Sequence, residues 1–191
     1  MTDLFAEAAR LQSILEKEGR DFFFVGGIAL QIWGQPRLTT DIDLTVFTNL
    51  VDETEQLKHF ASLYRTREEA EPDPIEFARV RRVLLLKTNT DTGIDLMLSG
   101  LADISDELKR SSYEQFTPEI SLKVCSADTL IAFKTVAGRL KDLADIESVI
   151  IRQQILDWDY IFSYLDLASE YKDISESMAT LHSLKEKYYR P

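Results

Sequence analysis

The segment "DIDLTVF" (41–47) constrains the fold most, because its polar and apolar residues alternate from Asp41 to Val46. This alternation is typical of a β-strand with one apolar face. Asp41 and Asp43 then project from the same face, with Cβ atoms about 6–7 Å apart. Two carboxylates held this close raise each other's pKa unless a cation lies between them. The segment therefore predicts a strand that carries a chemical site.

The surrounding pattern predicts an α/β (α+β) protein, with a small mixed β-sheet core, flanking helices and a helical C-terminal part. An amphipathic helix begins the chain, and Gly26-Gly27 ends an aromatic strand before a second helical stretch. The other elements that we expect are a helix at 50–64, strands at 77–88, 93–98 and 120–126, and four helices after residue 126. We place the boundary between a core at 1–125 and a helical part at 126–191.

Asp95 is a third candidate, because it interrupts the apolar strand "GIDLML". An isolated carboxylate would be expensive to bury there. If this strand lies beside the strand of Asp41, three carboxylates converge. Such oxygen ligands suit Mg²⁺, which also takes phosphate oxygens and water. Three carboxylates can hold two metal ions about 3.5–4 Å apart.

The two glycines fit a phosphate site. A strand, Gly26-Gly27 and a helix present free backbone N–H groups and the positive end of the helix. We expect a side chain at either glycine to hold a triphosphate away from these amides. Arg37, in the loop before Asp41, is a forked donor suited to phosphate oxygens.

Composition excludes some other functions. The net charge of −11 argues against nonspecific binding to duplex DNA. No apolar run approaches the roughly 18 residues of a membrane span, and the first residues read as a helix rather than a signal peptide. The single cysteine, Cys125, is expected to be a buried small side chain, and a cytoplasmic location is expected.

Taken together, these motifs resemble the nucleotidyltransferase superfamily with a DNA-polymerase-beta-like fold. Its signature, an apolar residue and two glycines followed after a spacer by Asp-x-Asp, is matched by residues 25–27 and 41–43. The resemblance implies that Asp41 and Asp43 bind Mg²⁺, and that Asp95 is a third ligand or the base. It also implies an NTP, such as ATP, held by Gly26, Gly27, Arg37 and Thr40.

The later stretch "LIAFKTVAGRLKDLADIESV" resembles AbiEii-type toxin nucleotidyltransferases. That resemblance implies that Lys134 contacts the triphosphate with a catalytic role, and that Arg139 and Asp142 approach the nucleotide, with Asp145 in the same element. Spacing alone permits another interpretation, a solvated helix face with Arg139–Asp142 and Lys141–Asp145 pairs.

The leading hypothesis is a metal-dependent nucleotidyltransferase that moves an NMP from an NTP to an acceptor hydroxyl and releases pyrophosphate. The acceptor is RNA or a protein in a toxin–antitoxin setting, with a cognate antitoxin as a possible partner. Arg79, Arg81, Arg82 and the terminal "KEKYYRP" are candidate acceptor contacts. One alternative is transfer to a small molecule, as in aminoglycoside and lincosamide nucleotidyltransferases. Another is a catalytically idle module that binds a partner protein.

Overall fold

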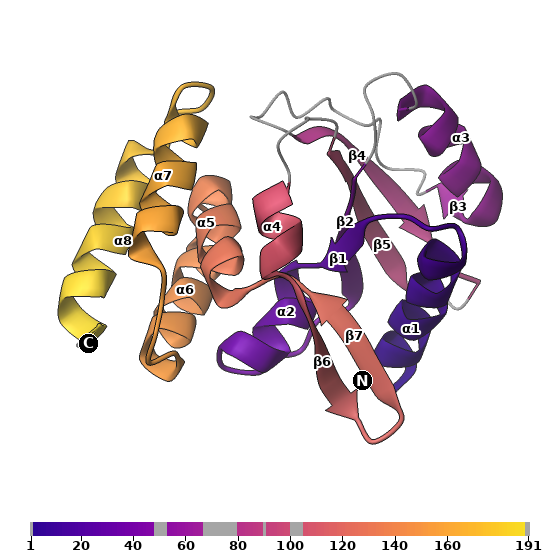
Figure 1. Cartoon of the computed structure of the whole chain (residues 1–191), viewed down its shortest axis with the longest axis horizontal. Helices are drawn as coiled ribbons and strands as arrows, with labels where there is room; N and C mark the ends of the chain where they lie inside the picture. The colour runs from indigo at the N-terminus through magenta and orange to yellow at the C-terminus, as the bar shows by residue number, and fades with distance from the viewer. Residues whose placement is uncertain (1, 48–52, 67–79, 90, 100–104, 190–191) are drawn as a thin grey trace.

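The computed structural model describes residues 2–47, 53–66, 80–89, 91–99 and 105–189. Here a seven-stranded sheet is covered by helices (Figure 1). The strands are β1 (Phe22–Phe24), β2 (Asp41–Phe47), β3 (Arg65–Thr66), β4 (Val80–Lys87), β5 (Gly93–Ser99), β6 (Ser112–Thr117) and β7 (Ile120–Val124). The helices are α1 (Thr2–Lys17), α2 (Gly26–Trp33), α3 (Glu53–Leu63), α4 (Ser105–Arg110), α5 (Ala127–Ala137), α6 (Leu140–Arg152), α7 (Trp158–Ser169) and α8 (Ser175–Tyr188).

The sheet is mixed, with the strand order β3-β4-β5-β2-β1-β7-β6. The central strand β2 runs parallel to β5 and antiparallel to β1. β1 also runs parallel to β7, whereas the outer pairs β3–β4, β4–β5 and β6–β7 are antiparallel. The predicted mixed sheet is confirmed, and the aspartate-bearing strand lies at its centre.

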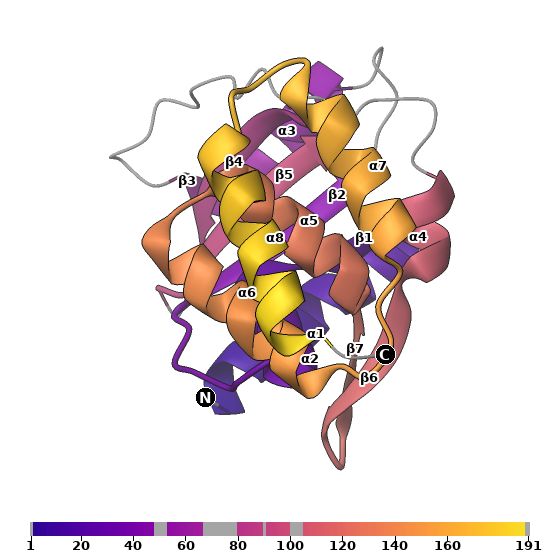
Figure 2. The ribbon, with the colours of Figure 1, turned by 90° about the vertical axis from the view of Figure 1, so that its left-hand side faces the viewer.

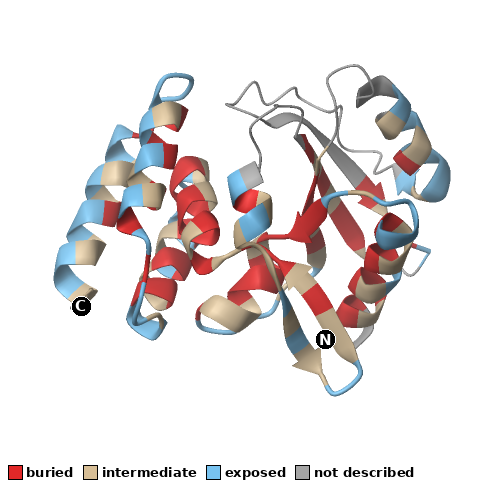
Figure 3. Ribbon diagram, viewed as in Figure 1, coloured by how far each residue is buried: buried red, intermediate tan, exposed pale blue. Residues whose placement is uncertain are grey.

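Both faces of β2 are covered. α1 packs across β7 and β2, and α2 packs on β2 from the other side (Figure 1). Ile42, Leu44 and Val46 are completely buried, as the alternation predicts. Thr45 is also buried, because a strand in the middle of a sheet has little solvent on either face. Buried residues accordingly run through the centre of the sheet and into the helices beside it (Figure 3).

The four C-terminal helices pack on one another, and α5 and α6 contact α2 (Figure 2). Only Cys125 and Ser126 separate β7 from α5. The Ser126 hydroxyl accepts a hydrogen bond from the Thr129 N–H and caps α5, which ends at Gly138 in the left-handed region with φ of +69°. The helical C-terminal part is thus confirmed, whereas the division of the chain at residue 125 stays a prediction.

Three elements were not expected from the sequence: the short strand β3, the short helix α4, and β6. β6 is an edge strand with a polar sequence and partly exposed side chains, so it lacks the apolar alternation that marks β2. Residues 50–52 of the expected helix and 77–79 of the expected strand lie outside the described residues. Cys125 is buried as predicted, and burial raises the pKa of its thiol.

Candidate functional site

The register between β2 and β5 decides where the carboxylates lie. In this parallel pair Asp43 is directly opposite Asp95, and Asp41 is opposite Gly93. Residues opposite each other in a sheet share a face, and Asp41 shares it because it lies two positions from Asp43. The structure therefore brings together all three predicted carboxylates, and each of them lines the same cavity.

Gly26 and Gly27 bring the start of α2 onto this strand. Gly26 has a φ of +54°, and a Cβ atom there would lie 2.1 Å from Oδ2 of Asp43. The N–H of Gly27 donates to the same oxygen over 3.2 Å, and a Cβ on Gly27 would lie 2.4 Å from Oγ1 of Thr39. The sequence predicted that the glycines make room for a ligand. In the structure they first make room for Asp43 and Thr39, and α2 begins at Gly26 itself rather than after the glycines.

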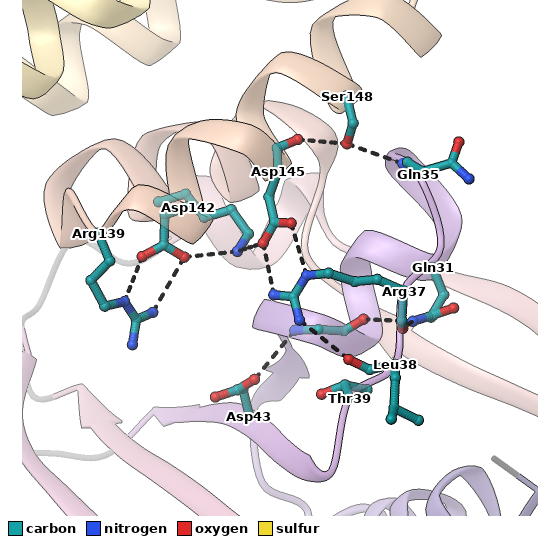
Figure 4. A network of polar contacts seen from close by, with 12 residues as sticks. Gln31, Gln35, Arg37, Leu38, Thr39, Asp43, Arg139, Asp142, Asp145 and Ser148 are labelled. Atoms are coloured by element: carbon teal, nitrogen blue, oxygen red, sulfur yellow. Dashed lines mark hydrogen bonds and ion pairs between the residues drawn. The ribbon is translucent and has the colours of Figure 1, made fainter.

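A line of five alternating charges, which we call the charge chain, joins α5, α6 and the loop before β2 (Figure 4). Its members, in spatial order, are Arg139, Asp142, Lys134, Asp145 and Arg37. The Lys134 ammonium at its centre donates to Oδ1 of Asp142 over 3.0 Å and to Oδ2 of Asp145 over 2.7 Å. Arg139 donates twice to Asp142 at one end, and Arg37 donates twice to Asp145 at the other.

Burial shows that the charge chain is not a solvated helix face. Asp142 is completely buried, and Asp145 and Lys134 are each only 5% exposed. Asp145 pairs with Lys134 and Arg37, so the alternative Lys141–Asp145 pairing is wrong. The Arg139–Asp142 pair does form, but with a buried carboxylate. The i, i+3 spacing correctly put the two aspartates on one stripe of α6, but it carried no information on what that stripe faces.

Opposite pKa shifts distinguish the carboxylates. Burial raises the pKa of Asp43, and the neighbouring charge of Asp95 raises it further. Burial also tends to raise the pKa values of Asp142 and Asp145. The hydrogen bonds and charges of Arg139, Lys134 and Arg37 outweigh this effect, so both pKa values are lowered. The charge chain is therefore internally compensated, whereas Asp43 lies in an environment that favours an added cation or proton.

The cavity has a volume of about 160 Å³. Every residue that the sequence analysis proposed for the site lines it: Gly26, Gly27, Arg37, Thr40, Asp41, Asp43, Asp95, Lys134, Arg139 and Asp142. Leu38, Thr39 and Lys141 line it as well and were not predicted. Lys141 carries a cationic group suited to phosphate, but in sequence it is one of many surface-type lysines, and the signal for Leu38 and Thr39 is only their position beside Arg37.

The residues present fit a magnesium ion in part. Carboxylate oxygens are its preferred protein ligands, and burial together with the neighbouring charge of Asp95 raises the pKa of Asp43, a shift that a bound cation would oppose. Within the described residues, however, no three His, Cys, Asp or Glu side chains already stand at the spacing of a complete metal site. The arrangement thus fits an ion that takes several ligands from water or substrate rather than one enclosed by protein.

Among the described residues, none of the basic side chains proposed as acceptor contacts lines this cavity. Arg79 and the side chains of Arg81 and Arg82 lie outside the described residues. Near the C-terminus, the Lys185 ammonium lies 4.7 Å from the centroid of the Trp158 ring, on the outer helices. None of the described residues from 185 to 189 lines the cavity.

No described helix has the length and apolar content to cross a bilayer.

Solved structures of similar fold support this architecture. The antibiotic-resistance factor ANT(2'')-Ia, in complex with adenylyl-2''-tobramycin, is 16% identical, with a TM-score of 0.50 over 98% of this chain and 99% of that one. The lincosamide antibiotic adenylyltransferase LnuA, with lincomycin bound, is 13% identical, with a TM-score of 0.50 over 73% of this chain and 92% of that one. At these identities the likeness concerns the fold alone.

Sequence comparison gives the family. No curated protein matches the chain. The family model described as "Nucleotidyl transferase AbiEii toxin, Type IV TA system" matches residues 11–157, which is more than half of the chain and includes every residue assigned above to the cavity and the charge chain. The predicted superfamily and branch are therefore confirmed: this chain belongs to the AbiEii toxin family of nucleotidyltransferases.

Proposed function

We propose that the protein transfers a nucleoside monophosphate from an NTP to an acceptor hydroxyl, with Mg²⁺ bound, and releases pyrophosphate. One observation carries the proposal. The in-register pairing of Asp43 with Asp95 puts two carboxylates beside Asp41 in a cavity that is also lined by basic side chains. Anionic groups for a metal and cationic groups for a triphosphate are thus present in one small volume.

Asp41, Asp43 and Asp95 would hold the metal. Bound there, Mg²⁺ would neutralise charge on the phosphate oxygens and on the leaving pyrophosphate. In the reaction the acceptor oxygen bonds to the α-phosphorus, and the bond from that phosphorus to the β-phosphate oxygen breaks. The proton of the acceptor hydroxyl passes to a base, and we assign Asp95 as that base or as the third metal ligand.

The cationic residues would bind the triphosphate. The side chains of Arg37 and Arg139 are 38% and 62% exposed, respectively, so they are accessible to a ligand. Lys134 has three donor hydrogens and gives two of them to aspartates, which leaves one for a phosphate oxygen at the cavity wall. The N-terminus of α2 and Thr40 complete the proposed nucleotide contacts.

A labelling experiment tests the proposal. Purified protein is incubated with each α-labelled NTP, with and without Mg²⁺, beside a tRNA pool, a protein extract and a panel of aminoglycosides and lincosamides. We expect Mg²⁺-dependent transfer of label to the RNA or protein fraction, in keeping with a cytoplasmic toxin that has a cognate antitoxin. Label on an antibiotic would instead support the small-molecule alternative.

Variants make the test specific to the site. Asp43→Asn keeps the size of the side chain but removes its charge, and it is expected to abolish transfer. Asp91→Asn is the matched control, because Asp91 pairs with Arg65 in an exposed turn away from the cavity. Wild-type transfer by Asp43→Asn would refute the assignment. The idle-module alternative predicts that no NTP raises the unfolding temperature of wild-type protein, with or without Mg²⁺.

A further inference from the structure

The loop that carries Arg37 is attached to α6 at several points. We call residues 34–40, between α2 and β2, the arginine loop. Arg152 donates to the carbonyl of Gly34 over 2.7 Å, and the hydroxyl of Ser148 accepts from the N–H of Gln35 over 3.0 Å. With Asp145 one turn before Ser148, these α6 residues follow the i, i+3, i+7 spacing of one helix face. That face of α6 therefore fixes the path of the arginine loop.

Asp145 holds the Arg37 guanidinium itself. Nε of Arg37 lies 2.9 Å from Oδ1 of Asp145, and Nη2 lies 2.8 Å from Oδ2, so the pair is bidentate (Figure 4). A bidentate pair fixes both the position and the plane of the guanidinium. Asp145 is itself fixed, because it is 5% exposed and accepts a hydrogen bond from Lys134. The orientation of Arg37 is thus imposed from α6.

The charge of Asp145 compensates Lys134 and Arg37 in the folded protein, but it does not by itself favour nucleotide binding. A nucleoside triphosphate is an anion, and a negative charge on Asp145 offsets the attraction of Arg37 and Lys134 for it. Any benefit of Asp145 to nucleotide binding must therefore come from geometry, because a side chain that is already oriented loses less freedom when the ligand binds.

We propose that Asp145 is a positioning residue, which orients Arg37 along the cavity wall so that its remaining donors meet the phosphates of the nucleotide. This inference rests on the proposed function, since it assumes that an NTP binds in the cavity. It extends the site beyond the cavity lining, because Asp145 acts through Arg37 and does not itself line the cavity.

The proposal is tested by whether one substitution at Asp145 weakens or strengthens nucleotide binding. The full chain is titrated by calorimetry with ATP, GTP, CTP and UTP in Mg²⁺, and the tightest of these is used for all variants. We expect Asp145→Asn to bind this NTP roughly tenfold more weakly, because the guanidinium loses a charge-assisted bidentate partner. If Asp145 matters only as a charge, the same variant binds the anionic nucleotide as tightly as wild type or more tightly, and the proposal is overturned.

A double-mutant cycle measures the coupling between Asp145 and Arg37 in nucleotide affinity, which a general loss of stability does not change. Arg37→Lys keeps the charge but lacks the planar fork, so it too is expected to weaken binding. Because the two residues act as one unit, the double variant is expected to bind the NTP no more weakly than whichever single variant has the lower affinity. Additive losses would contradict the proposal. Asp91→Asn, which removes the exposed partner of Arg65, is the control and is expected to bind as wild type does.

A third variant guards against misfolding. If Asp145→Asn does not fold, Asp145→Glu retains a negative charge near Lys134 but displaces the carboxylate by one methylene. Weaker binding by a folded Asp145→Glu supports positioning, and wild-type affinity overturns it. If wild-type protein binds no NTP, the proposed function fails together with this inference. If wild-type protein binds but both Asp145 variants bind equally well, only the inference fails.

Discussion

Replacing Gly26 with alanine tests how closely the start of α2 must approach the aspartate strand. The added Cβ would lie 2.1 Å from Oδ2, 2.5 Å from Cγ and 2.8 Å from Cβ of Asp43. Rotation of the Asp43 side chain moves Oδ2 and Cγ away, but Cβ is fixed to the backbone. Ordinary contact starts at 3.4 Å, so α2 and β2 must also move apart.

Two contributions set the size of the effect. An L-residue in the left-handed region costs about 1–2 kcal/mol, and the φ of Gly26 is +54°. Rotating Asp43 away breaks its hydrogen bond from the Gly27 N–H, which is worth about 1 kcal/mol. We therefore expect the free energy of unfolding to fall by about 2–3 kcal/mol, which lowers Tm by about 4–12 °C for a chain of this size.

Gly19→Ala is the matched control, because Gly19 has a φ of +65° but no atom within 4 Å of an added Cβ. It should show only the backbone strain of about 1–2 kcal/mol, with unchanged nucleotide binding. Thermal unfolding followed by circular dichroism and titration with the Mg²⁺–NTP complex measure both effects. Equal losses of stability in the two variants, with wild-type nucleotide affinity in Gly26→Ala, would refute the argument.

Lys134→Met is expected to destabilise the protein by about 3–5 kcal/mol, because Asp142 and Asp145 lose the cation between them. Thermal unfolding measures this, and the exposed Lys109→Met should stay within about 0.5 kcal/mol of wild type. The lowered pKa values of these two aspartates contribute stability that is complete above the ordinary value of 3.8 and lost as pH falls through their folded-state pKa. Denaturant unfolding at a series of acid pH values is expected to show this loss, and a flat profile would contradict it. The effect of Asp43 on stability is opposite in sign. Because its pKa is raised, metal-free protein becomes less stable as pH rises through the folded-state pKa of Asp43. Asp43→Asn should therefore have a higher Tm than wild type near neutral pH without Mg²⁺.

Local patterns predicted the central part of the fold well, because each depends on a few neighbouring residues. Alternation from Asp41 to Val46 identified β2 and the face of its aspartates. The flanking glycines and the apolar run around Asp95 identified the elements beside it. What alternation does not contain is the register between two strands far apart in the chain, since pairing is decided by the whole sheet. From the sequence, Asp43 and Asp95 are expected to meet only if their strands are neighbours. The structure shows that the strands are neighbours and that the two residues lie opposite each other.

The parts that were missed depend on tertiary contacts. A stripe of charges on α6 looks the same in sequence whether it faces water or the interior, and only packing against α5 and the arginine loop buries Asp142 and Asp145. The ion pair between Asp145 and Arg37 joins residues more than a hundred positions apart. β6 was missed for a related reason: an edge strand pairs on one side only, so its sequence is free to be polar.

The central place of β2 in the sheet has a consequence for the mobility of the cavity wall that β2 forms. Amide hydrogens of a strand bonded on both sides exchange only when much of the molecule opens, whereas those of a surface loop exchange through small local motions. The acidic side of the cavity is therefore expected to be as rigid as the sheet itself. On the opposite side Arg37 is fixed by Asp145, so adjustment to nucleotides or acceptors of different shape falls to Arg139, whose side chain is 62% exposed.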